Sequence, residues 1–333
     1  MNRNDYVALL DRIAAAGEDS RIHYLSGART GAHDPWDPTT DAPGQPVTGL
    51  GSACRDVGGD LVFVETLKGT PHLVIAGAGH VGVAVAHLGV LLGFRVIVVD
   101  ERPEFADPAR LPGVAEVLCG DYGTTLAALP PYGNAYYVLV TPGHRMDREA
   151  AAACLARPSE YVGMIGSRGK CATVRAALTS QGISPDAVAR LRAPIGLELG
   201  GREPAEIAVA IAAEIIQVRA RSGARSFDPN VATGIRALAS AAERPAVLAT
   251  IVGHGGSVPR GAGSRMLVDA SGPVAGSVGG GPIEAESIAH ALALLADPDA
   301  PGVGVQDYEL SNAQGAELGM ICGGRVRVLF ERL

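Results

Sequence analysis

Residues 72–102 read HLVIAGAGHVGVAVAHLGVLLGFRVIVVDER, and this stretch decides the fold. It opens with a short apolar run, 72–76, that predicts a buried strand. Glycines in G-x-G-x-x-G spacing follow, then a helical apolar pattern that ends at Gly93, and then a second apolar run at 95–99. The sequence therefore predicts a strand, a glycine loop, a helix and a second strand in that order.

The three glycines of the loop, Gly77, Gly79 and Gly82, have separate roles in a dinucleotide site. The first allows a tight turn, the second lets backbone approach a pyrophosphate, and the third brings helix and strand together. His80 follows at the helix N-terminus and is placed either to contact a phosphate or to cap the helix. Asp100 lies 18 residues after Gly82, where a ribose-binding carboxylate belongs. The alternative is an ordinary strand–helix–strand unit that binds no nucleotide and whose glycines serve only packing.

Three more apolar runs, at 115–118, 136–141 and 161–165, continue the pattern. They alternate with helical patterns, which predicts an α/β protein with a parallel, Rossmann-like sheet. Ligands of such sheets lie beyond the carboxyl ends of the strands. We therefore expect one site, lined by the loops that begin at Gly77, Asp100, Thr141 and Gly166 and including Arg102, Ser167 and Arg168. The position of Arg102 leaves the choice between NAD and NADP open.

Composition argues against several classes of function. The 333 residues are 47% hydrophobic and only 4% aromatic, and the formal net charge is −7. We therefore expect no binding to nucleic acid or to an anionic membrane. The five cysteines form no C-x-x-C pair and the histidines form no H-x-x-x-H pair, so we expect neither a disulfide framework nor a metal site. The first twenty residues do not resemble a signal peptide, which predicts a cytoplasmic protein.

The chain divides into three predicted parts: an N-terminal helix, long loop and strand (1–67), the Rossmann-like domain (68–221) and a smaller mixed α/β domain (230–333). In the first part, amphipathic periodicity predicts a helix at 4–16, and residues rich in Gly, Pro and Asp predict a loop at 27–57.

The strand predicted at 60–67 has a counterpart far along the chain. GGDLVFVETL (58–67) and GGRVRVLFERL (323–333) share two glycines, an apolar strand, a glutamate and a leucine. This similarity is explained either by chance or by the duplication of an ancestral unit.

Two glycine-rich loops of the last domain are further candidate sites. Loop 254–261 contains Ser257 and Arg260, and it fits either a phosphate cradle or a tight hairpin with a solvated arginine. The second candidate is a triple-glycine loop before a helix, formed by Gly279, Gly280 and Gly281. Glu284 in that helix would repel a phosphate. Its carboxylate would either accept hydrogen bonds from the N–H edge of a pterin or guanine, or only interact favourably with the helix dipole.

Candidates for catalytic chemistry are few. Cys322 is predicted in a loop, where it is either a reactive thiol or a buried inert one. Cys119 ends a predicted strand and is expected to face the core. His144 and Asp147 lie in 142–148, interpreted as a polar loop, and each is either an acid or base or a residue that only orders the loop.

Whole motifs support a family resemblance. GAGHVG, VVDERPEFAD, TPGHRMD, GMIGSRGK and APIGLELGGREPAEIAVAIAAEI resemble the Rossmann half of the XdhC/CoxI family. GHGGSVPRGAGSRMLV, GSVGGGPIEAE and LGMICGGRVRVLFE resemble the other domain of that family. The resemblance covers roughly residues 60–333 and implies an accessory factor for a molybdenum hydroxylase such as xanthine dehydrogenase.

The resemblance also implies a cargo and partners. Proteins of this family look like factors that hold molybdenum cofactor (molybdopterin), protect it while its terminal sulfur is installed, and pass it to the apo-enzyme. The implied partners are the apo-hydroxylase, a cysteine desulfurase and a second copy of the chain in a homodimer. On such a cofactor, glycine loops would bind the phosphate, Glu284 would contact the pterin, and Cys322 would lie near the metal.

Two features depart from the family pattern. The Rossmann-like domain comes first here, whereas the family places it second, and Pro282 stands where the family has a cysteine after the triple glycine. These departures keep two alternatives open. One is an NAD(P)-dependent oxidoreductase with His144 as acid or base, and the other is a scaffold that senses a nucleotide.

Overall fold

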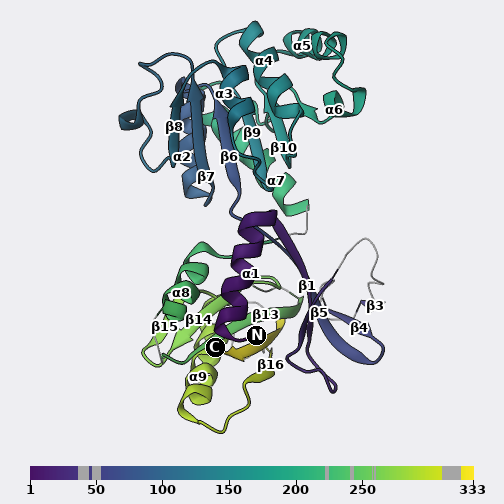
Figure 1. The fold of residues 1–333 in the computed structure, drawn as a ribbon, viewed down its shortest axis with the longest axis vertical. Coiled ribbons are helices and arrows are strands. Elements are labelled where there is room, and N and C mark those ends of the chain that lie inside the picture. Colours follow the sequence, from purple (N-terminus) through teal and green to yellow (C-terminus); the bar gives the residue numbers. More distant parts are fainter. Residues whose placement is uncertain are drawn as a thin grey trace. The chain divides into compact units, whose positions relative to one another are not determined.

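In the computed structural model the chain forms two compact units. One combines Met1–Leu67 with Arg225–Leu333, and we call it the two-segment unit. The other, Lys68–Ala224, is the parallel-sheet unit (Figure 1). The structure describes residues 1–36, 45–46, 54–221, 225–240, 244–256, 258, 260–309 and 324–333. No helix in these ranges is both long and apolar enough to cross a membrane.

Six parallel strands form the sheet of the parallel-sheet unit, in the order β11-β10-β9-β6-β7-β8. Numbered from β6 in chain order, this is the strand order of dinucleotide-binding sheets, and it confirms the predicted Rossmann-like sheet. The order reverses between β6 and β9, so the loops that leave these two strands flank the switch point. The bounds are β6 His72–Ala76, β7 Arg95–Asp100, β8 Glu116–Cys119, β9 Ala135–Leu139, β10 Tyr161–Met164 and β11 Leu191–Arg192.

Helices cover both faces of this sheet (Figure 1). Alternate side chains of β6 enter different cores, because successive residues of a strand point to opposite faces. Leu73 and Ile75 pack with α2 and α7, whereas Val74 packs with α3, α4 and α5. The bounds are α2 His80–Leu91, α3 Tyr122–Ala128, α4 His144–Leu155, α5 Arg168–Ser180, α6 Pro185–Ala189 and α7 Pro204–Arg221, with a 3₁₀ turn at Pro108–Arg110.

Two expectations for this unit are wrong. Helix α4 begins at His144, so most of the interval 142–148 is not a loop. Gly143 forms the N-cap, and Asp147 supplies an acidic side chain in the first turn, which favours a helix start. Cys119 is exposed rather than facing the core, because it is the last residue of the edge strand β8.

The two-segment unit contains two further sheets. One has the order β15-β14-β13-β17-β16 with antiparallel neighbours, and the other has the order β2-β1-β5-β4-β3 with β12 paired to β5. The bounds are β1 Glu18–Tyr24, β2 His33–Pro35, β3 Gln45–Pro46, β4 Cys54–Val57, β5 Asp60–Lys68, β12 Arg225–Ser226, β13 Ala246–Gly256, β14 Arg265–Asp269, β15 Gly272–Gly276, β16 Val303–Glu309 and β17 Gly324–Arg332.

Three helices pack on these sheets: α1 Arg3–Ala16, α8 Pro229–Ser240 and α9 Gly281–Ala296. The predicted N-terminal helix is confirmed as α1. Its apolar side pairs with α8 against β13 and β14 and buries Tyr6, Leu9, Leu10 and Ile13. The opposite side of β13 packs with α9 and with Phe63 of β5. The expected loop at 27–57 is wrong in part, because β2, β3 and β4 lie within it.

Candidate functional site

The glycine loop after β6 contains two glycines that packing alone requires. Gly77 has φ +113°, and a Cβ atom there would lie 2.4 Å from the carbonyl oxygen of Val140. A Cβ atom on Gly82 would lie 1.8 Å from the carbonyl oxygen of Gly77. Both glycines therefore serve the close approach of helix, loop and strand, whether or not a ligand binds.

Gly79 differs from its two neighbours. A Cβ atom added to Gly79 would meet nothing within 4 Å, and its φ of −70° suits any residue. Packing thus gives no reason for a glycine here. Gly79 is also the N-cap of α2, and no side chain caps that helix, including His80, which is exposed. The open space beside the helix N-terminus fits a phosphate group held by backbone N–H groups.

Asp100, at the carboxyl end of β7, is fully buried, and both of its carboxylate oxygens accept hydrogen bonds. One carboxylate oxygen accepts from the Ala78 N–H at 2.7 Å and from Nη2 of Arg102 at 2.9 Å. The other accepts from the backbone N–H and from Nε of Arg102, at 3.0 and 2.9 Å. Burial acts to raise the pKa of Asp100, but these hydrogen bonds outweigh it, and the pKa lies below its usual value.

Arg102 covers this carboxylate. Its guanidinium lies 3.6 Å from the centre of the Phe105 ring, and Arg110 lies 4.9 Å from the same ring. The Arg102 side chain remains 31% exposed, so part of the guanidinium faces solvent. The position that the sequence assigns to a ribose carboxylate therefore presents a cation.

A second polar group lies after β9 and β10. Asp147 in the first turn of α4 is fully buried, accepts a hydrogen bond from the Thr141 hydroxyl at 2.7 Å, and forms an ion pair with Lys170 of α5. Gly166 allows this pair, because a Cβ atom there would lie 2.8 Å from Cδ of Lys170. Ser167 caps α5 by accepting from the Lys170 N–H at 3.2 Å.

The sequence motifs gave no site role to Lys170, and they left Asp147 either an acid or base or a residue that only orders the loop. Both lie in motifs that we quoted, TPGHRMD and GSRGK, and their opposite charges were the signal available. Arg168, which we did select, is exposed and pairs with Glu198 at 3.0 Å. His144 is the first residue of α4. The structure thus brings Gly77, Gly166, Thr141 and Asp100 to one edge of the sheet, as expected for parallel strands.

The triple-glycine loop before α9 is organised by Glu284. One carboxylate oxygen of Glu284 accepts from the Ser277 hydroxyl at 2.5 Å and from the N–H groups of Val278 and Gly280 at 3.1 Å. Burial acts to raise the pKa of Glu284, but these hydrogen bonds lower it below its usual value. Two N–H groups of the loop therefore already hold a carboxylate of the protein itself.

The remaining candidates of the two-segment unit separate into described and undescribed residues. Gly279, Gly280 and Gly281 have positive φ values of 124°, 73° and 60°. Such values favour glycine at all three positions. Arg260 is exposed. Ser257 and Cys322 lie outside the described residues.

Comparison with known proteins identifies the family of the chain. A family profile described as the XdhC Rossmann domain matches residues 73–215, and one described as the XdhC and CoxI family matches 239–308. The chain belongs to the XdhC/CoxI family. In this XdhC/CoxI chain the Rossmann segment precedes the CoxI-type segment, which is the order that the sequence motifs indicated.

Individual relatives match parts of the XdhC/CoxI chain. "Uncharacterized protein YqeB" of Escherichia coli (strain K12) is 33% identical over 173 residues, which are 51% of this chain and 32% of the relative. A probable xanthine dehydrogenase subunit of Bacillus subtilis (strain 168) is 28% identical over 160 residues, 48% of this chain and 46% of the relative. This chain thus spans about a third to a half of the length of these relatives. The crystal structure of a xanthine dehydrogenase from Bacillus halodurans matches with a TM-score of 0.49 at 20% identity, over 64% of this chain and 65% of that one.

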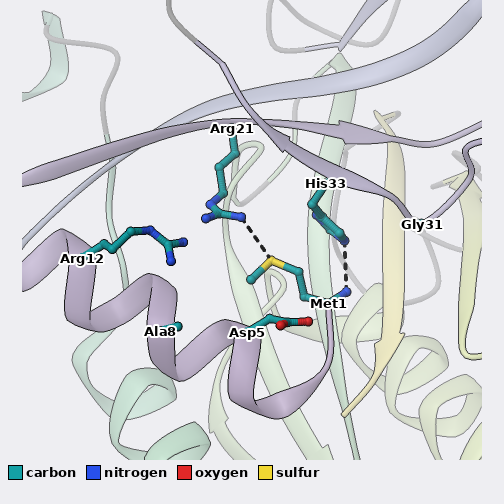
Figure 2. Close-up of a pocket in the computed structure, with 7 residues that line it drawn as sticks. All are labelled: Met1, Asp5, Ala8, Arg12, Arg21, Gly31 and His33. Carbon is teal, nitrogen blue, oxygen red and sulfur yellow. Dashed lines mark hydrogen bonds between the residues drawn. The ribbon is translucent and has the colours of Figure 1, made fainter.

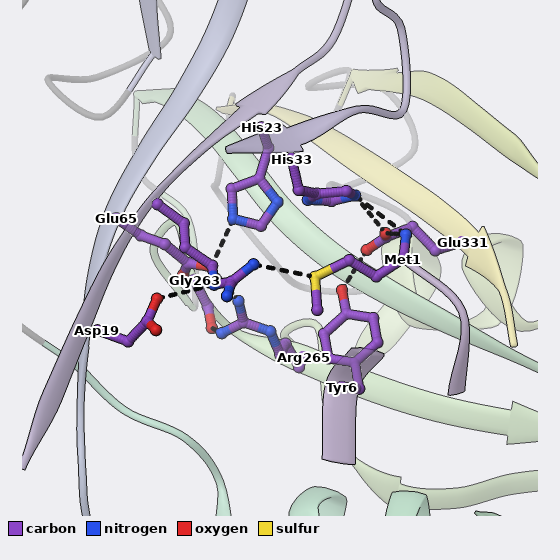
Figure 3. A network of polar contacts seen from close by, with 10 residues as sticks. Met1, Tyr6, Asp19, His23, His33, Glu65, Gly263, Arg265 and Glu331 are labelled. Carbon is purple, nitrogen blue, oxygen red and sulfur yellow. Dashed lines mark hydrogen bonds and ion pairs between the residues drawn. The ribbon is translucent and has the colours of Figure 1, made fainter. Parts of the chain in front are cut away.

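The two-segment unit of this XdhC/CoxI protein also contains a buried polar network (Figure 3). Glu65 of β5 accepts from Nε2 of His23 at 2.8 Å and pairs with Arg265, and all three side chains are buried. Burial alone would raise the pKa of Glu65, but Arg265 and His23 lower it to about 2. The glutamate is therefore ionised across the physiological range.

Glu331 of β17 is the second buried carboxylate of this network. It contacts the amino group of Met1 and Nε2 of His33, each at 2.8 Å, and accepts a hydrogen bond from the Tyr6 hydroxyl. Burial acts to raise the pKa of Glu331, yet His33 and the amino group hold it well below its usual value. Glu65 and Glu331 are the glutamates of the two echoed strands. Among the described residues, no set of three or more potential ligands is arranged to hold a metal ion.

A pocket of about 460 Å³ lies beside this network (Figure 2). Arg12, Arg21 and His33 line it together with Met1 and Asp5. The cations are compensated within the protein. Both arginines pair with Asp19, at 3.0 and 2.8 Å, and His33 pairs with Glu331. These ion pairs connect α1 to β1 and β2 to β17, and the charges that line the pocket give no reason to assign a ligand.

Proposed function

We propose that this XdhC/CoxI protein is an accessory factor for a molybdenum hydroxylase of the xanthine dehydrogenase type, and that it carries molybdenum cofactor as its cargo. The observation that carries the proposal is the presence of both family segments, 73–215 and 239–308, on one chain. A relative named as a probable xanthine dehydrogenase subunit supports the connection to that enzyme.

The chemistry of the cargo matches groups on this chain. Molybdenum cofactor carries a phosphate, a pterin with an N–H edge, and a metal bound through sulfur. Glu284 suits the pterin, because its hydrogen bonds from Ser277, Val278 and Gly280 all use the same carboxylate oxygen. Arg260 suits the phosphate, because it is an exposed cation in the glycine-rich loop 254–261, and Ser257 and Cys322 complete the proposed cargo site.

The proposal includes the handling of the cargo. The protein would protect the cofactor while a cysteine desulfurase supplies its terminal sulfur, and would then deliver it to the apo-hydroxylase. A homodimer is part of this proposal. Pro282 replaces the cysteine that the family pattern places after the triple glycine, so Cys322 is the thiol that we assign to the metal.

The deciding experiment measures cargo directly. We would purify the protein anaerobically from a cofactor-producing host and measure molybdenum by mass spectrometry and pterin by fluorescence after oxidation. Stoichiometric molybdenum and pterin are expected. Arg260→Ala should lower both, because it removes the cation proposed to hold the phosphate. Arg244→Ala is the matched control, since Arg244 is an exposed arginine of the same unit outside the candidate loops. Protein without molybdenum or pterin would contradict the carrier function.

A second candidate function is favoured by the strand order of the parallel-sheet unit. That order, with Gly79 at the switch point and Asp100 after β7, is the arrangement that binds dinucleotides. The protein would then act as a nucleotide-dependent oxidoreductase or nucleotide sensor. Nucleotide released from the same purified sample and identified by chromatography tests this candidate independently of molybdenum.

A further inference from the structure

We propose that the parallel-sheet unit binds NADP(H) in preference to NAD(H), and that Arg102 receives the 2′-phosphate of the adenosine ribose. This inference rests on the second candidate function, dinucleotide binding after β6 and β7. It adds a ligand class and a specificity-determining residue that neither the strand order nor the glycine spacing provides.

The first step is that Asp100 has no acceptor capacity left for a ribose. A carboxylate that binds the two ribose hydroxyls of NAD must accept hydrogen bonds from both. Each oxygen of Asp100 already accepts two hydrogen bonds, three from Arg102 and one from the Ala78 N–H. A carboxylate offers about four acceptor sites in total. NAD would therefore have to displace Arg102 from a buried carboxylate.

The second step is that Arg102 keeps donors free for an anion. A guanidinium carries five N–H donors. Arg102 uses Nε and Nη2 toward Asp100, and Nη1 has no hydrogen bond to the described residues. The side chain is 31% exposed, so these donors are accessible. Arginine binds phosphate through such paired donors, and the contact is charge-assisted.

The third step is that Arg102 is held in position before any ligand arrives. Asp100 fixes one edge of the guanidinium, and Phe105 covers one face at 3.6 Å. Arg110 brackets the same ring at 4.9 Å and donates to the Phe105 carbonyl oxygen at 3.1 Å. A preorganised arginine binds a phosphate without first losing the freedom of a mobile side chain.

The fourth step places this cation at the right end of a dinucleotide. Ala78, which donates to Asp100 at 2.7 Å, is the residue between Gly77 and Gly79. The carboxylate that holds Arg102 is thus one hydrogen bond away from the loop that would cradle the pyrophosphate. The adenosine ribose follows directly after the pyrophosphate in a dinucleotide, so its 2′-phosphate is the group that reaches Arg102.

The test is a calorimetric titration of the full chain with NADP⁺, with NAD⁺ and with adenosine 2′,5′-bisphosphate, which has a 2′-phosphate but no pyrophosphate. The wild type should bind NADP⁺ at least about tenfold more tightly than NAD⁺. Arg102→Ala should weaken NADP⁺ by roughly 10- to 100-fold. It should leave NAD⁺ unchanged or tighter, because Asp100 becomes available to the ribose. A loss of affinity for NADP⁺ without a loss for NAD⁺ is expected only if Arg102 binds the 2′-phosphate.

Two further variants keep the test decisive. Arg95→Ala removes a cation from the other end of the same strand, where it pairs with Glu116, and should change neither affinity. Arg102→Lys keeps the charge without the paired donors and should give an intermediate loss for NADP⁺. Equal wild-type affinities for both nucleotides, an equal loss of both in Arg102→Ala, or no binding of either would overturn the inference. None of these results depends on molybdenum content, so the carrier function stands or fails separately.

Discussion

At the scale of single residues, Gly79 and Gly82 separate the requirements of packing from those of a ligand. We expect Gly82→Ala to lower the free energy of unfolding by about 3 kcal/mol, because the new Cβ atom would lie 1.8 Å from a backbone oxygen that has no room to move. Gly79→Ala should change it by less than about 0.5 kcal/mol. Denaturant unfolding of both variants measures this contrast. Similar losses in both would show that Gly79 also serves packing.

Glu65 gives a residue-scale prediction with a pH dependence. Its pKa of about 2 in the folded protein lies below the usual value of 4.5, so its stabilising effect is complete above pH 4.5 and disappears as the pH falls toward 2. Glu65→Gln should cost roughly 3 kcal/mol near neutral pH, because Arg265 and His23 lose their buried partner.

The pH series distinguishes this ion pair from a general loss of packing. Unfolding free energies of wild type and Glu65→Gln should converge between pH 4.5 and pH 2. The exposed Glu286→Gln serves as the control and should follow the wild type at every pH. A constant gap between wild type and Glu65→Gln would mean that the charge of Glu65 does not stabilise the fold.

At the scale of secondary-structure elements, the ion pair of Asp147 with Lys170 connects α4 to α5. Asp147→Asn should weaken the unit by about 1 to 3 kcal/mol, because Lys170 loses a buried carboxylate. Hydrogen exchange should accelerate in 141–147. Glu149→Gln is the matched control on the same helix, since its pair with the exposed Arg145 is 3.6 Å long and should contribute almost nothing. Unchanged exchange in Asp147→Asn would remove this pair from the candidate site.

Apolar periodicity explains which elements were predictable. The strands and helix of 72–99 are apolar on the faces that pack, so their apolar pattern was sufficient to predict them. Strand β1 reads EDSRIHY and carries no such signal, because Arg21 and His23 are buried through ion pairs rather than through apolar contact. The start of α4 was hidden in the same way by the polar residues HRMDR. Burial that depends on a charged partner leaves no apolar periodicity.

The position of the candidate site in the sheet was predictable, but the hydrogen bonding of the Asp100 carboxylate was not. Parallel strands bring their carboxyl ends to one edge, so the loops at Gly77, Asp100 and Thr141 could be grouped from the sequence alone. Whether the Asp100 carboxylate is free or covered depends on the rotamer of Arg102 and on its packing against Phe105. Spacing does not encode either of these, and it gave equal support to NAD and NADP.

At the scale of the whole molecule, the two units should differ in their ability to fold alone. A fragment of residues 68–224 contains a complete sheet with helices on both faces and should unfold cooperatively. A fragment of residues 225–333 lacks α1 and β5, and leaves Arg265 and Glu331 buried without their partners. We expect it to show no cooperative transition by circular dichroism. Cooperative unfolding of that fragment would mean that residues 1–67 are not required for this sheet.

The contact of Tyr6 with Glu331 bridges 325 positions of the chain. A ribosome adds roughly 5 to 20 residues per second, so about 15 to 65 seconds separate the synthesis of the two partners. The parallel-sheet unit is complete before Glu331 is made and is able to close while translation continues. Helix α1 meanwhile presents its apolar side to solvent and to chaperones. Nascent chains stalled before α8, which covers that apolar side together with β13 and β14, should therefore bind such chaperones through α1.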